Sequence, residues 1–429
     1  MLNKKITIFG LGKSGIAAAK KLAALGAKVF ATDEKEPKGM DDLKKLGIEL
    51  ELGGHTMKAI EGAELIVVSP GVHLDIPVLE EAKKRNIPII SEIELASRFL
   101  TKPIIAITGT NGKTTTTTLI GEMLKAGGKK IAVAGNIGAP LIEVDDKNLD
   151  FIVVEVSSYQ LETIVDFKPF ISVILNIQPD HLERHHTMAE YAAQKARLFM
   201  NQAGDDSFVV YNEDDPEVVK LVRGARGEVR GFSKQHPEII TIGPEKIKIP
   251  GRHNLENALA AAQTAYLCGI SKTVVAEVLK TFPGVEHRIE FVAKINGVEC
   301  YNDSKGTNPD STMVAIDTFK GKGIILILGG RDKGVGLDPL IKKVKENVKL
   351  VVLIGEAAPR FEKALRDQGY SSIHNSGFSL AAAVNLAFTM AAPKDIILFS
   401  PACASFDMFD NYEARGKEFK SLCQKIKNQ

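Results

Sequence analysis

The stretch that decides the fold is TGTNGKTT at residues 108–115, which directly follows the apolar run Ile104–Ile107. A glycine-rich loop between a buried strand and a helix presents backbone N–H groups to phosphate oxygens. Lys113 would neutralise the β- and γ-phosphates of a nucleotide, and the Thr114 hydroxyl would reach Mg²⁺. The usual spacing of such a loop places a glycine where this chain has Ile107, so the loop is a shortened version. An exposed glycine and threonine turn is the alternative, but a GKT run after a buried strand favours a nucleotide site.

Outside this loop, short apolar runs alternate with helical patterns along most of the chain. Continuous β-branched runs are typical of parallel strands covered on both faces. We expect strands at residues 6–9, 28–32, 65–68, 88–90, 104–107, 131–133, 151–156, 172–175, 323–328, 349–354 and 396–400, with helices at 15–25 and 254–268. The Asn296-Gly297 pair between residues 291–295 and 298–301 is typical of a two-residue hairpin turn. Strand and helix alternation of this kind predicts an α/β protein.

Length and composition limit the possible classes of protein. The chain has 429 residues, which corresponds to about three domains at roughly 150 residues each. Lys and Arg number 55 and Asp and Glu 53, so the net charge of +2 argues against a general basic field for nucleic acid. The N-terminal segment lacks the pattern of a signal peptide, and no apolar run approaches the roughly 20 residues that span a bilayer. We therefore expect a soluble, cytoplasmic protein with no nucleic-acid or membrane partner. We also expect a monomer, although no feature of the sequence bears on the oligomeric state.

The four cysteines show neither disulfide nor zinc spacing. None forms a CxxC pair, and we expect reduced, mostly buried thiols at Cys268, Cys300, Cys403 and Cys423.

A second phosphate-binding pattern, GLGKSG at residues 10–15, follows the first predicted strand and opens a helix. Glycines let the backbone approach a pyrophosphate, and the helix N-terminus contributes N–H groups and positive potential. Asp33, at the end of the next strand, lies where a ribose contact would be. NAD, FAD and a UDP-sugar all remain open as the nucleotide, and so does a tight turn whose glycines serve packing alone. Together with the alternating pattern, GLGKSG predicts a Rossmann-like N-terminal domain.

Three further polar residues have the chemistry of a metal or phosphate site. Glu155 interrupts the apolar strand predicted at residues 151–156, where a carboxylate is costly unless it is paired or binds a metal such as Mg²⁺. His181 follows Asp180 in a predicted loop and could bind a metal or phosphate, although a loop histidine is more often an ordinary surface residue. Lys195 on a predicted helix would, by the same reasoning, be a solvated lysine.

The last third of the chain carries three polar clusters, each directly after a predicted strand: residues 302–308, 329–334 and 400–406. Ligands of open α/β sheets bind at the carboxyl ends of strands, so we expect these clusters to form one composite pocket. Ordinary polar loops are the alternative for any single cluster.

Taken in order, these motifs resemble the Mur ligases, the ATP-dependent amide-forming enzymes of bacterial peptidoglycan synthesis. The matching stretches are GTNGKTT at 109–115, EVSS at 155–158, Asp180-His181, GRHNLENALAA at 251–261, His287-Arg288 and NDSKGTN at 302–308. The NDSKGTN cluster, SPACASFD at 400–407 and the N-terminal GLGKSG domain favour the member of the family that adds D-glutamate. The DNPR motif expected of the diaminopimelate-adding member is absent, since the nearest string is TNPD at 307–310.

The resemblance implies three domains: a Rossmann-like UDP-substrate domain at residues 1–92, a central P-loop ATPase-like domain with a parallel or mixed sheet at 93–284, and a Rossmann-like amino-acid domain at 285–429. Four residues would be catalytic: Lys113, Glu155, His181 and Lys195. Two magnesium ions would be held by Thr114, Glu155, His181 and Lys195, with Lys195 carbamylated by CO₂.

Binding roles also follow from the resemblance. ATP would contact Gly109, Thr110, Asn111, Gly112, Lys113, Thr114, Thr115, Asn257, Arg288, Asp303 and Lys305. The UDP-linked substrate would contact Lys13, Ser14, Asp33, Ser69, Gly71 and Asn136, and D-glutamate would contact Thr307, Lys333, Ser405 and Phe406.

The implied reaction joins D-glutamate to UDP-N-acetylmuramoyl-L-alanine through an acyl phosphate, with ATP as co-substrate. Two alternatives remain at this point. One is a ligase of the same type with a different amino acid, or a relative of folylpolyglutamate synthase, although the GLGKSG domain argues against the folate relative. The other is an NAD-binding protein whose P-loop is incidental.

Overall fold

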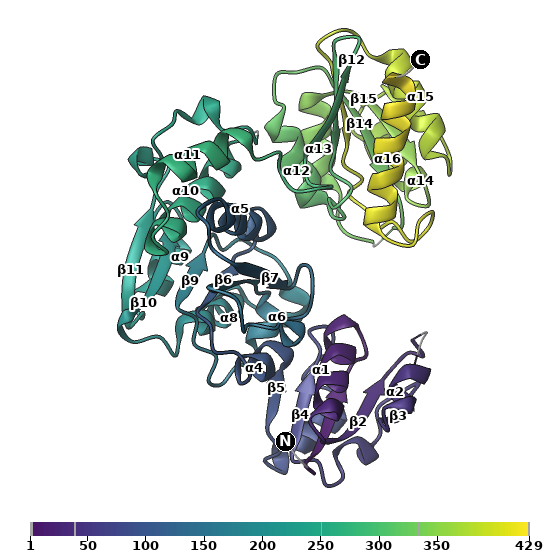
Figure 1. Cartoon of the computed structure of the whole chain (residues 1–429). Helices are drawn as coiled ribbons and strands as arrows, with labels where there is room; N and C mark the ends of the chain where they lie inside the picture. The colour runs from purple at the N-terminus through teal and green to yellow at the C-terminus, as the bar shows by residue number, and fades with distance from the viewer. Residues whose placement is uncertain (1–2, 38–39, 250, 333, 428–429) are drawn as a thin grey trace. The chain divides into compact units, whose positions relative to one another are not determined.

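The computed structural model describes residues 3–37, 40–249, 251–332 and 334–427 (Figure 1). Two compact units make up the chain: Met1–Lys246 with His253–Lys280, and Ile247–Arg252 with Thr281–Gln429. Three sheets form in the described residues, two in the first unit and one in the second. The prediction of an α/β protein with three parallel or mixed sheets is confirmed.

The first sheet has the strand order β3-β2-β1-β4-β5 and is parallel throughout. Its strands are β1 (Lys5–Phe9), β2 (Lys28–Asp33), β3 (Glu49–Leu52), β4 (Leu65–Val68) and β5 (Ile89–Ser91). Its helices are α1 (Lys13–Ala24), α2 (Asp41–Lys45), α3 (Pro77–Lys84) and α4 (Glu92–Ser97), with a 3₁₀ turn η1 (Met57–Ile60). Because β1 alternates, Ile6 and Ile8 pack with α1 while Phe9 joins a separate cluster near α3.

The second sheet has the order β11-β10-β9-β6-β8-β7 and is also parallel. The strands are β6 (Ile104–Thr108), β7 (Ile131–Gly135), β8 (Phe151–Glu155), β9 (Ile171–Ile174), β10 (Gly204–Asn212) and β11 (Gly227–Phe232). The α-helices are α5 (Lys113–Ala126), α6 (Ser158–Leu161), α7 (Leu182–His185), α8 (Met188–Ala196), α9 (Pro216–Val222), α10 (Arg252–Leu267) and α11 (Lys272–Thr281). Short 3₁₀ turns are η2 (Leu141–Glu143), η3 (Arg197–Phe199), η4 (Pro237–Ile239) and η5 (Pro244–Lys246). Strand β6 is central, so the loop that follows it is flanked by the ends of β8 and β9.

The third sheet has the order β12-β13-β17-β14-β15-β16, and only the β12–β13 pair is antiparallel. Its strands are β12 (Glu290–Ile295), β13 (Val298–Asn302), β14 (Ile324–Gly329), β15 (Val348–Ile354), β16 (Ile373–Asn375) and β17 (Ile396–Phe399). Its helices are α12 (Pro309–Thr318), α13 (Asp338–Asn347), α14 (Ala358–Asp367), α15 (Leu380–Met390) and α16 (Tyr412–Lys427). The predicted hairpin is confirmed, because Asn296 and Gly297 both adopt positive φ between β12 and β13.

Both faces of the third sheet are covered. Ile324, Leu326 and Leu328 of β14 pack in one apolar cluster, and Ile325 and Ile327 pack in another on the opposite face. A strand that is buried on both faces has no polar alternation, which is why these strands were visible in the sequence as continuous apolar runs.

Candidate active site

The loop after β6 is shaped for close approach of a ligand to the backbone. Gly109 and Gly112 have positive φ, and a side chain at either position would clash, against Leu175 and Asn257 respectively. Gly112 is the N-cap of α5 and offers no side chain to the N–H groups of the first turn. The N–H groups and positive potential of a helix N-terminus attract anions, so the loop fits the predicted phosphate contacts from Gly109 through Thr115.

Lys113 folds back over this loop. Its Nζ donates to the carbonyl oxygens of Gly109 and Thr110, at 2.8 Å each. The same Gly109 oxygen accepts a hydrogen bond from Nζ of Lys195, at 2.9 Å. Two amines from different helices therefore meet at one backbone oxygen of the predicted phosphate loop, residues 108–115.

Lys195 is buried to 1% exposure, so the expectation of a solvated lysine is wrong. Its ammonium position lies 4.5 Å from the ring centre of Tyr191, whose hydroxyl contacts Thr110 Oγ1 at 3.1 Å. Burial, and then the nearby charge of Lys113, hold the pKa of Lys195 well below its ordinary value. Burial beside Lys113 thus disfavours the charged form of Lys195 next to the loop after β6.

Glu155 ends β8 at the level of Ile107 in β6 and is 2% exposed. Its Oε1 accepts from Asn136 Nδ2 at 2.8 Å, while its buried Oε2 has no hydrogen-bond partner within the described part of the chain. A buried carboxylate oxygen without a donor is costly unless a cation binds it, so Glu155 fits the predicted magnesium role. This arrangement also brings the predicted residues Asn136 and Glu155 together.

His181 lies in the segment after β9, with a half-exposed side chain and a positive φ of 54°. Its ring centre is 4.8 Å from that of Tyr159, which stands on α6 shortly after Glu155. The described residues contain no group of three His, Cys, Asp or Glu side chains that could hold a metal ion. The predicted magnesium set is of another kind, because it also draws on a threonine hydroxyl and a modified lysine.

Asn257 on α10 lies next to Gly112 of the predicted phosphate loop. Its Oδ1 accepts from Thr116 Oγ1 at 3.3 Å, and its Nδ2 donates to Asn254 Oδ1 at 3.0 Å. A residue predicted to contact the nucleotide is therefore fixed next to Gly112.

In the first sheet, the predicted UDP-substrate residues gather at the carboxyl ends of the strands. Asp33 Oδ2 accepts from the N–H of Leu11 at 2.6 Å, and Ser69 Oγ donates to the carbonyl of Gly10 at 2.7 Å. Lys13 and Ser14 open α1, and Gly71 lies in the exposed loop after β4. Both Asp33 oxygens bond backbone N–H groups, since Oδ1 accepts from Lys35, so Asp33 shapes the glycine loop itself.

In the second unit, the three polar clusters do form one group. Asp303 Oδ2 accepts from Ser400 Oγ at 2.7 Å, joining the first cluster to the third, and the N–H of Arg331 donates to Ala404 O at 2.9 Å, joining the second to the third. Burial raises the pKa of Asp303 to about 6, while Ser400 and the charge of Arg288 act in the opposite direction. Lys305 lies over the ring of Tyr412, at 5.8 Å.

Of the predicted D-glutamate residues, Thr307 follows Lys305 in the first cluster, and Ser405 is buried in the third. Phe406 is 68% exposed, and Lys333 lies outside the described residues.

Sequence reasoning missed Arg415, which is fully buried on α16. Its guanidinium donates to the carbonyl oxygens of Ser304, Cys403 and Ala404, at 2.8 to 3.0 Å. Arg415 therefore ties the first cluster to the third. An arginine in a helix gives no sign of this in the sequence, because its partners come from loops about 10 and 110 residues away.

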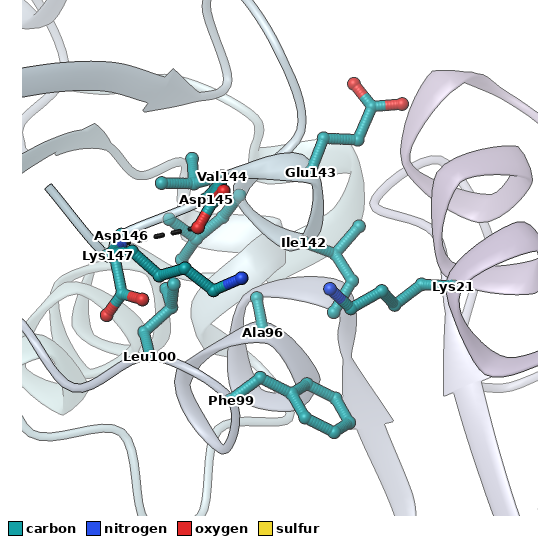
Figure 2. Close-up of a pocket in the computed structure, with 11 residues that line it drawn as sticks. Lys21, Ala96, Phe99, Leu100, Ile142, Glu143, Val144, Asp145, Asp146 and Lys147 are labelled. Carbon is teal, nitrogen blue, oxygen red and sulfur yellow. Dashed lines mark hydrogen bonds between the residues drawn. The ribbon is translucent and has the colours of Figure 1, made fainter. Parts of the chain in front are cut away.

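A separate pocket of about 330 Å³ lies between α1, α4 and the η2 segment and contains none of the predicted site residues (Figure 2). Its lining combines Lys21 and Lys147 with three carboxylates around Phe99. Such mixed charges select no single class of ligand, so we assign this pocket no role.

All four cysteines are buried and free, as expected. Among the described helices, none combines the length and apolar character that crossing a membrane requires.

The fold and this site define a nucleotide-using enzyme built from three α/β sheets. Residues 4–91 match the Mur ligase MurD-like N-terminal domain, 107–265 the Mur ligase middle domain and 287–403 the Mur ligase glutamate ligase domain. The chain belongs to the Mur ligase family.

Curated relatives agree with this assignment, and a solved structure shares the fold. UDP-N-acetylmuramoylalanine--D-glutamate ligase of Thermoanaerobacter sp. (strain X514) is 47% identical over 453 aligned residues, covering 99% of each chain. The enzyme of the same name from Clostridioides difficile is 42% identical, again over 99% of each chain. The crystal structure of UDP-N-acetylmuramate-alanine ligase MurC from Thermotoga maritima shares the fold, with a TM-score of 0.60, 21% identity and coverage of 98% of this chain and 99% of that one.

Proposed function

We propose that this chain joins D-glutamate to the L-alanyl carboxylate of UDP-N-acetylmuramoyl-L-alanine, with conversion of ATP to ADP and phosphate. The relatives named above carry this activity in their names and match the chain over its full length. The observation that supports it most strongly is the grouping of Lys113, Lys195 and Glu155 around the loop after β6. Family membership leaves the nicotinamide-binding alternative without support.

The first chemical step activates a carboxylate. A free carboxylate is a poor electrophile, so one of its oxygens attacks the γ-phosphorus of ATP, the bond to the bridging oxygen of ADP breaks, and an acyl phosphate forms. The N–H groups at the start of α5 and the ammonium of Lys113 would hold the transferring phosphoryl group and offset its charge.

The second step forms the amide. The neutral amine of D-glutamate attacks the acyl carbon, the C–O bond to phosphate breaks, and the nitrogen loses a proton. The acyl phosphate must be kept from water during this step, and we propose that the amino-acid domain contributes to that exclusion.

Magnesium, when bound, would neutralise the phosphate oxygens during transfer. Glu155 and Thr114 would hold one ion and His181 the second, with Lys195 contributing to the metal site as a carbamate. In forming that carbamate, the neutral Lys195 nitrogen attacks the carbon of CO₂ and loses a proton, which turns an amine into an anion. Burial beside a second amine favours the neutral form that this addition requires.

The remaining assignments follow the same division. We propose a UDP-substrate domain at residues 1–92, an ATP domain at 93–284 and an amino-acid domain at 285–429. The UDP-linked substrate would contact Lys13, Ser14, Asp33, Ser69 and Gly71 in the first domain and Asn136 in the second. ATP would also contact Asn257, Arg288, Asp303 and Lys305, and D-glutamate would contact Thr307, Lys333, Ser405 and Phe406. We further propose a monomer acting in the cytoplasm, where ATP is supplied, and the mass in solution tests the monomer.

An isotope experiment tests the proposed chemistry. UDP-N-acetylmuramoyl-L-alanine labelled with ¹⁸O in its carboxylate should transfer one labelled oxygen to inorganic phosphate for each amide formed. Unlabelled phosphate with amide product would contradict the acyl phosphate, and a lack of product would contradict the function.

A further inference from the structure

The segment that carries His181 is held by a buried histidine that no role described so far uses. His185 ends the single turn α7 and is 4% exposed. Its Nε2 lies 3.0 Å from Ser158 Oγ, and its Nδ1 lies 3.6 Å from Glu162 Oε1. Glu162 is itself fixed by Arg184, which pairs with both carboxylate oxygens at 2.9 and 2.5 Å. Nε2 is therefore hydrogen-bonded to helix α6, and Nδ1 faces the carboxylate of Glu162 directly after that helix.

The backbone of this segment needs such support. His181 and His186 both adopt positive φ, at 54° and 58°, on either side of α7. Residues other than glycine are disfavoured at positive φ, and they keep this conformation only where surrounding contacts hold it in place. A four-residue helix provides little stability of its own, so the contacts of the His185 side chain carry more of this task.

The same ring contacts two tyrosines that adjoin residues of the proposed magnesium site. His185 stacks on Tyr159 at 5.5 Å between ring centres and contacts Tyr191 at 5.4 Å. Tyr159 also contacts His181, and Tyr191 lies under Lys195. Ser158, the partner of Nε2, stands three residues after Glu155. One side chain thus contacts neighbours of Glu155, His181 and Lys195.

We propose that His185, through its hydrogen bond with Ser158, is a positioning residue that sets His181 and Lys195 relative to Glu155 for magnesium binding. This inference rests on the proposed function, because it assumes the metal roles of those three residues. Removing a residue that orients metal ligands typically lowers metal affinity or activity about 10- to 100-fold.

The test compares four single variants of the full chain, together with the double variant that combines His185→Phe and Ser158→Ala. His185→Phe keeps a ring between the tyrosines but removes the bond to Ser158, and Ser158→Ala removes the same bond from the other side with little change in volume. His185→Gln keeps a polar group within reach of Ser158. His186→Asn is the matched control, since His186 is exposed and asparagine tolerates positive φ.

Three quantities are measured for each variant. They are the Mg²⁺ concentration that gives half-maximal ADP formation, the ¹³C signal of a carbamate after exposure to labelled CO₂ with Mg²⁺ but no substrates, and the thermal midpoint. We expect His185→Phe and Ser158→Ala to raise the half-saturating Mg²⁺ concentration about tenfold and to weaken the carbamate signal. The double variant should be no worse than either single variant, because both changes remove one bond. His185→Gln should recover part of the loss, and His186→Asn should match the unmodified protein.

Unchanged Mg²⁺ dependence and carbamate signal in both Ser158→Ala and His185→Phe would overturn the inference. A lower thermal midpoint with unchanged Mg²⁺ dependence would also overturn it, since that result describes a structural role alone. Failure of the unmodified protein to form amide contradicts the proposed function instead, and the ¹³C measurement, which needs no substrate, still decides the role of His185.

Discussion

The carbonyl oxygen of Gly109 accepts hydrogen bonds from both Lys113 and Lys195. Two ammonium groups at one acceptor would repel each other, and Lys195 is the more buried of the two. The low pKa of Lys195 follows from this burial first and from the charge of Lys113 second. We therefore propose different tasks for the two lysines: Lys113 offsets phosphate charge, and Lys195, whose pKa burial lowers, takes up CO₂.

The first prediction concerns Lys113. Lys113→Ala should lower the rate of ADP formation at least about 100-fold, because the charge on the transferring phosphoryl group loses its nearest cation. Lys125→Ala on the same helix is the matched control, since Lys125 is an exposed partner of Glu122. Steady-state release of ADP measures both, and a near-normal rate in Lys113→Ala would rule out its role.

The second prediction concerns Lys195. Lys195→Ala should remain folded and lose most activity, and added short-chain carboxylates should restore part of it by standing in for the carbamate. The rate is measured with and without acetate or propionate, beside Lys220→Ala as an exposed control. Full activity without any added acid would contradict the assignment.

For single residues, the sequence indicates the roles of glycines and carboxylates, but it misleads about the burial of lysine and arginine side chains. Gly112 and Glu155 were visible because their neighbours in the chain define the loop and the strand. Lys195 and Arg415 are buried by partners far away in sequence, namely Gly109 and Ser304, so a helical pattern alone leaves them as surface residues. Only the resemblance pointed to Lys195, and nothing pointed to Arg415 or His185.

Among the elements, helix α4 carries two buried carboxylates with different surroundings. Glu94 Oε2 accepts three hydrogen bonds, from the backbone N–H groups of Val165, Asp166 and Phe167, at 2.9 to 3.0 Å. Glu92 Oε1 accepts one, from Ile142 at 2.7 Å, and its buried Oε2 has no partner in the described part of the chain. Burial therefore raises the pKa of Glu92 to about 7.

The third prediction follows from the sign of this shift. Between about pH 4.5 and 7 the folded protein binds the Glu92 proton more tightly than the unfolded chain does, so stability falls as the pH rises through this window. Glu92→Gln removes this titration and keeps an oxygen for Ile142. Its stability relative to the unmodified protein should rise by about 2 to 3 kcal/mol from pH 4.5 to pH 8.

Urea unfolding at several pH values measures this difference. Glu122→Gln, an exposed change on α5, should follow the unmodified protein at every pH. Parallel stability curves for Glu92→Gln and the unmodified protein would show that Glu92 titrates normally.

The strands that sequence reasoning missed also share a physical cause. Three of the four, β3, β11 and β16, lie at the edges of their sheets, and the fourth, β10, begins with the polar residues GDDS. Edge strands are often short or polar because an exposed apolar edge promotes aggregation. Every inner strand except β10 and β13, by contrast, is predicted from its apolar run, since packing on both faces leaves no place for polar side chains.

For the whole molecule, we propose that the three sheets serve one reaction with three substrates. The first sheet presents a glycine loop braced by Asp33 and Ser69. The second presents the loop after β6 with Glu155 and Lys195, and the third presents polar loops tied together by Arg415. Each of these features lies at the carboxyl ends of parallel strands, where open α/β sheets bind ligands.

The most direct test is product formation by the purified protein with ATP, Mg²⁺, UDP-N-acetylmuramoyl-L-alanine and a panel of amino acids. Amide is measured by mass and ADP by a coupled assay. The account predicts amide and ADP in equal amounts with D-glutamate, and neither with L-alanine or meso-diaminopimelate. Product with either of those two but not with D-glutamate, or no amide and no ADP with any of them, would contradict it.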